Sequence, residues 1–263
     1  MQLYVKEIGI AAPGLAGWKE SVPVLRGENS FTPTPLEKYK PGCLPPNEAR
    51  RATQLVRLAF RAAEDAVSGN AEQAKNLATV FSSSGGDYII IDQICTVLTQ
   101  PEHAVSPTQF HNSVHNSAAG YWSIGTGSTL PSNSLSAHDY SFALGLIEAA
   151  GMVLVDELDT LLVVYDICPP PRLQKKRPIL QEFGSAMTLS RDSVGAVAQL
   201  TLEYQPGSEQ AEQPLTGWME FFSSNPAARA LPLLEKIARR EAGELTLNLP
   251  SGPALRIMVK PCC

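Results

Sequence analysis

Several features that mark specialised classes of protein are missing from this sequence. No hydrophobic run approaches the ~20 residues that a membrane-spanning helix needs, and the first residues lack the charged and apolar segments of a signal peptide. Lys and Arg form no long run, and the formal charge is −5, which argues against phosphate-backbone recognition. We therefore expect a cytoplasmic protein with no membrane span and no nucleic-acid partner.

Cysteine is also scarce, with five residues in 263 and no C-x-x-C spacing. An odd number without paired spacing favours reduced thiols over a disulfide framework or a zinc site. The final pair, Cys262 and Cys263, is more typical of an exposed tail with free thiols than of a lipidation signal. Neither G-x-G-x-x-G nor G-x-x-x-x-G-K-[ST] occurs, so we expect no cofactor and no metal.

What the sequence does contain is typical of a globular α/β protein. Hydrophobic residues make up 44% and charged residues 18% of the chain, which is long enough to bury a sizeable core. Hydrophobic periodicity predicts strands over 2–12, 77–82, 132–137, 160–167, 185–190, 195–204, 244–249 and 254–260. It predicts helices over 48–67, 88–98, 112–124, 139–155 and 227–240. Residues 14–46 are too rich in Pro and Gly to assign, and 206–214 resemble a surface linker.

These elements predict a layered, mostly parallel sheet flanked by helices, with a small C-terminal α/β appendage. The continuous apolar run 160–167 favours a central strand, whereas the short segment 132–137 is expected to be a buried strand. Strands 185–190 and 195–204 are expected to form a hairpin. Asn47 is the expected N-cap of the long helix 48–67. We place one domain over 1–204 and the appendage over 205–263.

Two histidines, His111 and His115, stand four residues apart and would share one face of a helix. Such a pair can hold zinc, but metal sites of this kind need a third ligand or the H-E-x-x-H pattern. No Glu follows His111, so the pattern favours histidines that make structural hydrogen bonds.

The richest polar cluster is His138-Asp139-Tyr140-Ser141, at a predicted junction between a strand and a helix. A helix N-terminus lowers the pKa of an acid or thiol, so a nucleophile at this position is one interpretation. The other is that Asp139 caps the helix. Because no G-x-S-x-G surrounds Ser141 and a carboxylate does not replace a thiolate in acyl transfer, we favour the cap.

The segment around this cluster resembles the N-terminal half of β-ketoacyl synthases, which have the thiolase-like fold. The matching positions are Asn116, Ala119, Gly120, Gly125 and the turn Pro131-Ser132. In that family a nucleophilic Cys then opens a buried helix, and its position falls on Asp139. The resemblance extends over about residues 1–200, including the helix 48–67 and the LATVFSSSGG turn.

Two departures from the family pattern indicate that this chain is not a condensing enzyme by itself. The nucleophilic Cys is absent, and the family's two activating histidines have no counterpart, because no histidine follows His138. The chain also has about half of the family's length. It is therefore more similar to the truncated ketosynthase-like subunits called chain length factors, especially those of aryl polyene clusters.

This resemblance implies a non-catalytic subunit that forms a heterodimer with a full-length ketosynthase, stabilises it and shapes its acyl tunnel in polyketide or aryl polyene biosynthesis. Asp139 would be catalytically silent. The candidates for interface or tunnel residues are His138, Asp139, Tyr140, Ala118, Ala119 and Gly120. The candidates for docking an acidic acyl carrier protein are Arg57, Arg61, Arg172, Lys175, Lys176 and Arg177, with Arg50 beside the first two.

Each of these groups also has a plainer interpretation. Small helical residues are usually core, and surface cations are usually only solvated. Two other functions stay open at this point. One is a degenerate enzyme that transfers acyl groups or hydrolyses thioesters with His138, Asp139 or Ser141, and the other is a module that only binds acyl carrier protein.

Overall fold

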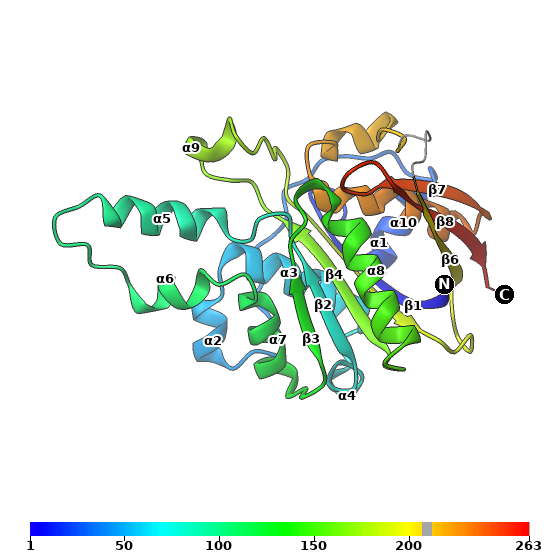
Figure 1. Ribbon diagram of the computed structural model, residues 1–263, viewed down its shortest axis with the longest axis horizontal. Helices are drawn as coiled ribbons and strands as arrows, with labels where there is room; N and C mark the ends of the chain where they lie inside the picture. The colour runs from blue at the N-terminus through cyan, green and yellow to red at the C-terminus, as the bar shows by residue number, and fades with distance from the viewer. Residues whose placement is uncertain (207–211, 263) are drawn as a thin grey trace.

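The computed structural model describes residues 1–206 and 212–262. Within these residues the strands form one sheet of eight in the order β3-β2-β4-β5-β1-β6-β8-β7 (Figure 1). The strands are β1 (Gln2–Ala11), β2 (Ala78–Ser82), β3 (Ser132–Leu135), β4 (Thr160–Asp166), β5 (Phe183–Ser190), β6 (Ala198–Gln205), β7 (Gly243–Asn248) and β8 (Ala254–Pro261).

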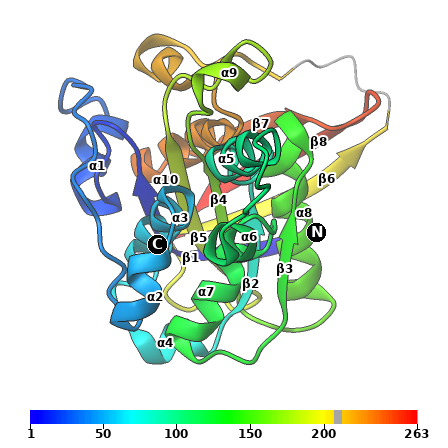
Figure 2. The same cartoon turned by 90° about the vertical axis from the view of Figure 1, so that its left-hand side faces the viewer.

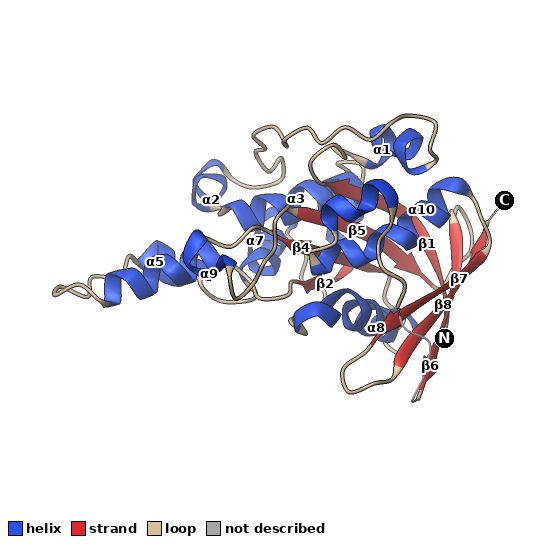
Figure 3. Cartoon of the chain, turned by 90° about the horizontal axis from the view of Figure 1, so that it is seen from above, coloured by secondary structure: helices blue, strands red, loops and turns tan. Residues whose placement is uncertain are grey.

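Helices cover both faces of this sheet (Figure 3). They are α1 (Trp18–Leu25), α2 (Pro46–Arg51), α3 (Gln54–Ala66), α4 (Ala71–Lys75), α5 (Tyr88–Leu98), α6 (Pro107–Asn112), α7 (Ser117–Thr126), α8 (Ser141–Leu154), α9 (Pro171–Gln174) and α10 (Leu231–Arg239). Three short 3₁₀ helices are η1 (His138–Tyr140), η2 (Gly217–Phe222) and η3 (Pro226–Ala230).

Two apolar cores lie on opposite faces of the sheet. Alternate residues of β4 belong to alternate cores, with Leu162 and Val164 in one and Leu161 and Val163 in the other. The first core contains the buried faces of α8, η3 and α10, and the second contains those of α3 and α7. This two-sided packing confirms the predicted α/β fold class with a sheet flanked by helices.

Strand directions are mixed. β2 pairs in parallel with both β3 and β4, and the other neighbouring strands are antiparallel to each other. The description "mostly parallel" therefore applies to the β3-β2-β4 part of the sheet and not to the strands beyond it. The parallel part matters for the site, because it brings the carboxyl ends of three strands together.

Two strand predictions need correction, and a third is confirmed. β5 and β6 do not form a hairpin, because β1 lies between them and pairs antiparallel with both. β5 is buried along its whole length and needs a partner on each edge, which the N-terminal strand provides. β3 is an edge strand with exposed residues rather than a buried one, whereas β4 is a fully buried central strand as predicted.

The predicted helix 48–67 is divided into α2 and α3 at Ala52 and Thr53. Thr53 is extended, and its side chain accepts a hydrogen bond from the Val56 amide, so it caps α3 at its N-terminus. A Thr hydroxyl that bonds the backbone favours such a cap over continuation of the helix. The N-cap of α2 is Pro45 and not Asn47, and α1 lies in the stretch that the sequence left unassigned.

The C-terminal residues continue the same architecture. β8 pairs with β6 and β7 pairs with β8, so the sheet runs across the expected boundary at 204/205. α10 shares its core with α8. The separate domains 1–204 and 205–263 stay a prediction. Part of the expected linker 206–214, and Cys263, lie outside the described residues. None of the helices in residues 1–206 and 212–262 combines the length and apolar character that a bilayer crossing demands.

Candidate functional site

Polar side chains gather where the three parallel strands end. Ser83 and Ser84 follow β2, η1 follows β3, and Asp166 is the last residue of β4. Ligands of α/β proteins bind at this end of parallel strands, since the loops there converge. We define the carboxyl-end cluster as Ser83, Ser84, His138, Asp139, Asp166 and Arg177.

Asp166 is the buried centre of this cluster, with 1% of its surface exposed. Its Oδ1 accepts hydrogen bonds from the Ser83 hydroxyl (3.0 Å), the Ser84 amide (2.9 Å) and the Ser84 hydroxyl (2.7 Å). Burial raises the pKa of Asp166 to about 6, although the bonds from Ser84 and Ser83 and the charge of Arg177 act in the opposite direction. Its Oδ2 is buried and has no hydrogen-bond partner among residues 1–206 and 212–262.

Asp139 is held by an ion pair at the start of α8. Arg177 Nη1 lies 2.5 Å from Asp139 Oδ1, and His138 Nδ1 lies 3.4 Å from the same oxygen. The side chain of Arg177 is 11% exposed, whereas that of Asp139 is 42% exposed. The predicted capping role of Asp139 is wrong, because neither η1 nor α8 receives a side-chain cap. The neighbouring guanidinium holds the carboxylate instead.

Ser141 is fully occupied by local backbone contacts. Its hydroxyl donates to the His138 carbonyl (2.8 Å) and accepts from the Ala137 amide (3.0 Å). Its own carbonyl accepts from the Ser82 hydroxyl (2.8 Å). His138 itself has a positive φ of 53°, a backbone conformation that residues other than Gly adopt infrequently. The turn between β3 and α8 is therefore fixed by Ser141 rather than by Asp139.

Arg177 joins the carboxyl-end cluster from a distant part of the chain, the loop after α9. The sequence places it among the docking cations, but its residue surface is only 9% exposed and its guanidinium turns inward. Its Nε and Nη2 are buried and have no hydrogen-bond partner in the structure. The neighbouring cations are exposed: Arg172 on α9, and Lys175 and Lys176 after it.

The other predicted docking cations lie in a separate place, on α3. Arg57 and three further cations line a hollow of about 450 Å³ whose remaining lining residues are uncharged. We call the cations Lys38, Lys40, Arg50 and Arg57 the cationic groove. Arg61 lies beside it, with its guanidinium 5.8 Å from the centre of the Tyr39 ring. Sequence reasoning missed Lys38 and Lys40, because they lie in the unassigned stretch 14–46.

None of these five cations has an ion-pair partner in the described part of the chain. Unpaired positive charge that faces solvent attracts acidic partners over several ångströms. The cationic groove is thus a concentrated positive surface on a protein of formal charge −5.

The small residues of α7 are divided between the core and the surface. Ala118 and Ala119 are buried, at 0% and 4% exposure, in the core that α7 shares with α3. Gly120 is exposed, and an added Cβ there would meet no atom within 4 Å. Of the predicted interface residues on α7, Gly120 is the one at the surface.

A projecting arm next to α7 carries exposed apolar side chains. Residues 88–114, which we call the arm, include α5 and α6 and extend away from the sheet on the side of β3 and α7 (Figures 1 and 2). In α5, an apolar helix, the only buried residue is Ile90. The arm exposes Ile91, Leu98, Phe110 and Val114 at 40%, 50%, 67% and 48%. This apolar surface gave no clear sequence signal, because helix periodicity does not reveal whether a helix has a partner.

The two spaced histidines make separate structural contacts. His115 Nε2 lies 2.9 Å from the Leu135 carbonyl oxygen, and His111 packs edge-on against the ring of Tyr121. In the described ranges no three His, Cys, Asp or Glu side chains come together as metal ligands. Cys43, Cys95, Cys168 and Cys262 are free thiols.

Solved structures with this fold are ketosynthases and their complexes. A ketosynthase in complex with its chain length factor from Xenorhabdus doucetiae matches with a TM-score of 0.71 and 24% identity, over 99% of both chains. The ishigamide ketosynthase/chain length factor matches with a TM-score of 0.77 and 12% identity over 100% of both chains. A type II polyketide synthase ketosynthase in complex with its acyl carrier protein matches with a TM-score of 0.77 and 10% identity over 99% of both chains.

At such low sequence identity, these structural matches establish only the fold, which is that of the ketosynthases. No functionally curated protein shows significant sequence similarity to the chain. The family model described as "Beta-ketoacyl synthase, N-terminal domain" matches residues 25–245, which is most of the chain. The chain therefore belongs to the family of β-ketoacyl synthase N-terminal domains.

Proposed function

We propose that this protein is the non-catalytic, chain-length-factor-type partner of an active β-ketoacyl-acyl carrier protein synthase. It forms a heterodimer with that enzyme, stabilises it and shapes its acyl tunnel during polyketide or aryl polyene synthesis. The chain does not form an acyl-enzyme intermediate itself.

The ion pair at the start of α8 is the principal support. In the resembling enzymes a Cys thiolate at this place attacks the thioester, and a carboxylate does not take over that step. Here Asp139 is also neutralised by Arg177 at 2.5 Å. The only hydroxyl nearby on α8, that of Ser141, already donates to the His138 carbonyl instead of to a base.

Two surface features support a partner chain on the β3 side. Within the described residues β3 pairs with β2 on one edge only, so its other edge offers backbone groups that a second strand can pair with. Next to it, α7 exposes Gly120 and Ile124, and the arm exposes the ring of Phe110. Apolar side chains at such exposure are typical of surfaces that a partner covers.

The comparisons point the same way at the level of assembly. Two of the matching structures are described as a ketosynthase with its chain length factor, and the matches extend over nearly the whole of both chains. We transfer that assembly to this chain as part of the proposal. The interface residues would then be those at the surface of the predicted set, namely His138, Asp139, Tyr140 and Gly120.

Acyl carrier protein is the second proposed partner, and the cationic groove is its proposed docking surface. A carrier protein presents acidic helices, which Arg57 and its neighbours would attract. Arg172, Lys175 and Lys176 form a second exposed positive group. Arg177 is not part of either surface, because it is bound to Asp139.

The test of the catalytic part is an acylation assay on the purified complex. The complex is incubated with an acyl-loaded carrier protein, and the intact mass of each chain is measured. We expect the acyl mass increment on the partner only, with the same result for the D139A variant. An acyl adduct on this chain that disappears in D139A or S141A would contradict the proposal and favour a degenerate acyl-transfer enzyme.

A further inference from the structure

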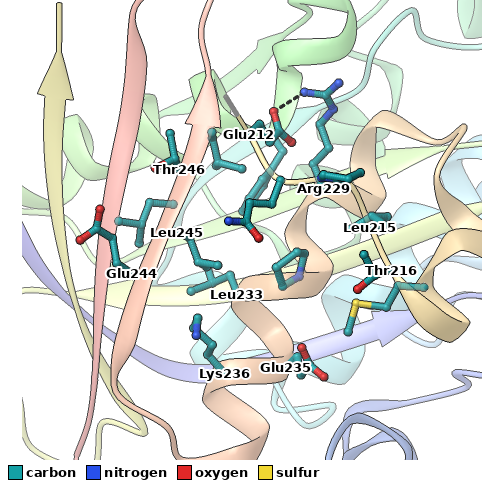
Figure 4. Close-up of a pocket in the computed structure, with 17 residues that line it drawn as sticks. Glu212, Leu215, Thr216, Arg229, Leu233, Glu235, Lys236, Glu244, Leu245 and Thr246 are labelled. Atoms are coloured by element: carbon teal, nitrogen blue, oxygen red, sulfur yellow. Dashed lines mark hydrogen bonds and ion pairs between the residues drawn. The ribbon is translucent and has the colours of Figure 1, made fainter. Parts of the chain in front are cut away.

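A second concave site lies on the opposite end of the sheet from the arm. It is a cavity of about 570 Å³ between α10, the β7-β8 pair and the segment 212–219 (Figure 4). Cavities of this volume accommodate small organic ligands. None of the residues named in the proposed function lines it.

The floor of this cavity is apolar. Phe142, Met219, Leu233, Leu247 and Ile257 line it, and each of them is at most 6% exposed. These side chains belong to five elements of the core, so the floor is continuous with the protein interior. An apolar group that enters the cavity would exchange water for these contacts.

The wall formed by the segment 212–219 is fastened to β7. The Asn248 amide donates to Glu212 Oε2 at 3.2 Å, and the Glu212 amide donates to Asn248 Oδ1 at 3.3 Å. Arg229 Nη1 lies 2.5 Å from the same Glu212 oxygen. The cavity is therefore enclosed by defined contacts on this side rather than by a loosely packed loop.

The charges on the lining leave one cation uncompensated. Each lining carboxylate has an arginine partner: Glu212 with Arg229 (2.5 Å), Glu235 with Arg239 (2.8 Å) and Glu244 with Arg256 (2.6 Å). Lys236 lines the cavity as well, and it has no carboxylate within ion-pair distance among residues 1–206 and 212–262. In Figure 4 its side chain lies beside that of Leu233.

We propose that this cavity binds a carboxylic acid with a straight apolar tail. Lys236 receives the carboxylate, and the tail lies on Leu233, Leu247 and Ile257. Lys236 is the one ammonium on the lining without an ion-pair partner among the described residues, so it can balance one negative charge on the ligand. A second negative charge would be repelled by the lining carboxylates Glu212, Glu235 and Glu244. The apolar floor favours a tail over a compact polar anion. This binding is independent of whether the chain pairs with a ketosynthase.

The test uses octanoate as the probe and measures binding to the full chain by calorimetry. Trp218 provides a second signal, because it stands between the lining residues Thr216 and Met219 and stacks on Phe31 at 4.9 Å. We expect saturable binding with a Kd between about 10 µM and 1 mM, which suits a ligand of this size. Octanol, which has the tail without the charge, and acetate, which has the charge without the tail, are each expected to bind at least tenfold more weakly.

Substitution of Lys236 locates the carboxylate. K236M is expected to weaken octanoate binding about tenfold or more, and K236R is expected to restore most of it. K260M is the matched control, because Lys260 is exposed on β8 and does not line the cavity. Absence of saturable octanoate binding, or equal binding by K236M and the native chain, would overturn the proposal. Equal loss in K260M would do the same, since it would indicate unspecific charge attraction.

Discussion

At the residue scale, Asp166 places one ionisable group of the carboxyl-end cluster where water is excluded. Asp166 is ionised at neutral pH only at a cost, because burial raises its pKa to about 6 from an ordinary 3.8. The folded state therefore binds the Asp166 proton more tightly than the unfolded state does. The resulting contribution to stability is complete below pH 4 and is lost as the pH rises through about 6.

The substitution D166N removes this dependence. An amide oxygen can still accept the bonds from Ser83 and Ser84, and it carries no charge that burial penalises. We expect D166N to be more stable than the native chain by about 3 kcal/mol at pH 8 and nearly equal to it at pH 4. Urea unfolding at several pH values measures the difference, with D159N at an exposed site as control. A D166N variant that is less stable at pH 8 would mean that Arg177 and the serines more than offset the burial.

The Asp139–Arg177 contact has its own prediction. A double-mutant cycle with D139N and R177M is expected to give a coupling free energy of about 1 kcal/mol, moderated by the partial exposure of Asp139. Urea unfolding of the native chain and the three variants supplies the four values. A coupling near zero would show that the two side chains do not stabilise each other, and the account of a neutralised Asp139 would lose its basis.

Sequence reasoning located Asp139 but not its environment. The family resemblance placed it at the nucleophile position, and local patterns then favoured a helix cap. The partner that decides its state, Arg177, is 38 residues away and follows a proline-rich loop, so no spacing rule connects the two. Asp166 was missed for a similar reason, because the end of an apolar strand gives no signal that its last side chain is buried among serines.

At the element scale, local patterns predicted most helices and strands, and the errors arise from long-range pairing. β4 was placed correctly inside the sheet because the sequence there is a nearly continuous apolar run, and all seven residues of the strand are buried. The β5-β6 hairpin failed because β1, from the other end of the chain, inserts between them. Such an insertion depends on which strands need two partners, and a single strand's pattern does not contain that information.

The arm provides the clearest test at this scale. The substitution F110E is expected to change the free energy of unfolding of the isolated chain by less than about 0.5 kcal/mol, since the ring is 67% exposed. It is expected to weaken binding to the ketosynthase partner at least tenfold, because a charge would be buried in an apolar interface. Urea unfolding of the isolated chain measures the first change, and calorimetric titration against the ketosynthase measures the second.

The control for the arm is V194E, in the loop between β5 and β6. Val194 is 77% exposed and lies outside the arm, β3 and α7. We expect V194E to bind the partner like the native chain. If F110E and V194E bind equally well, the arm is not part of the interface.

At the scale of the whole molecule, the distribution of features is uneven. The β3 edge, the arm and the exposed side of α7 lie together on one side (Figure 2), whereas the ligand cavity lies among α10, β7 and β8. A net charge of −5 coexists with a groove lined by four cations.

The most direct test of the central claim is native mass spectrometry of this chain, affinity-purified from its own host. The account predicts a one-to-one complex with a full-length ketosynthase and the loss of that complex in F110E. The chain would bury an area of the obligate class, above ~2,000 Å², in such a complex. A native chain recovered only as a monomer or as a homodimer would contradict the account.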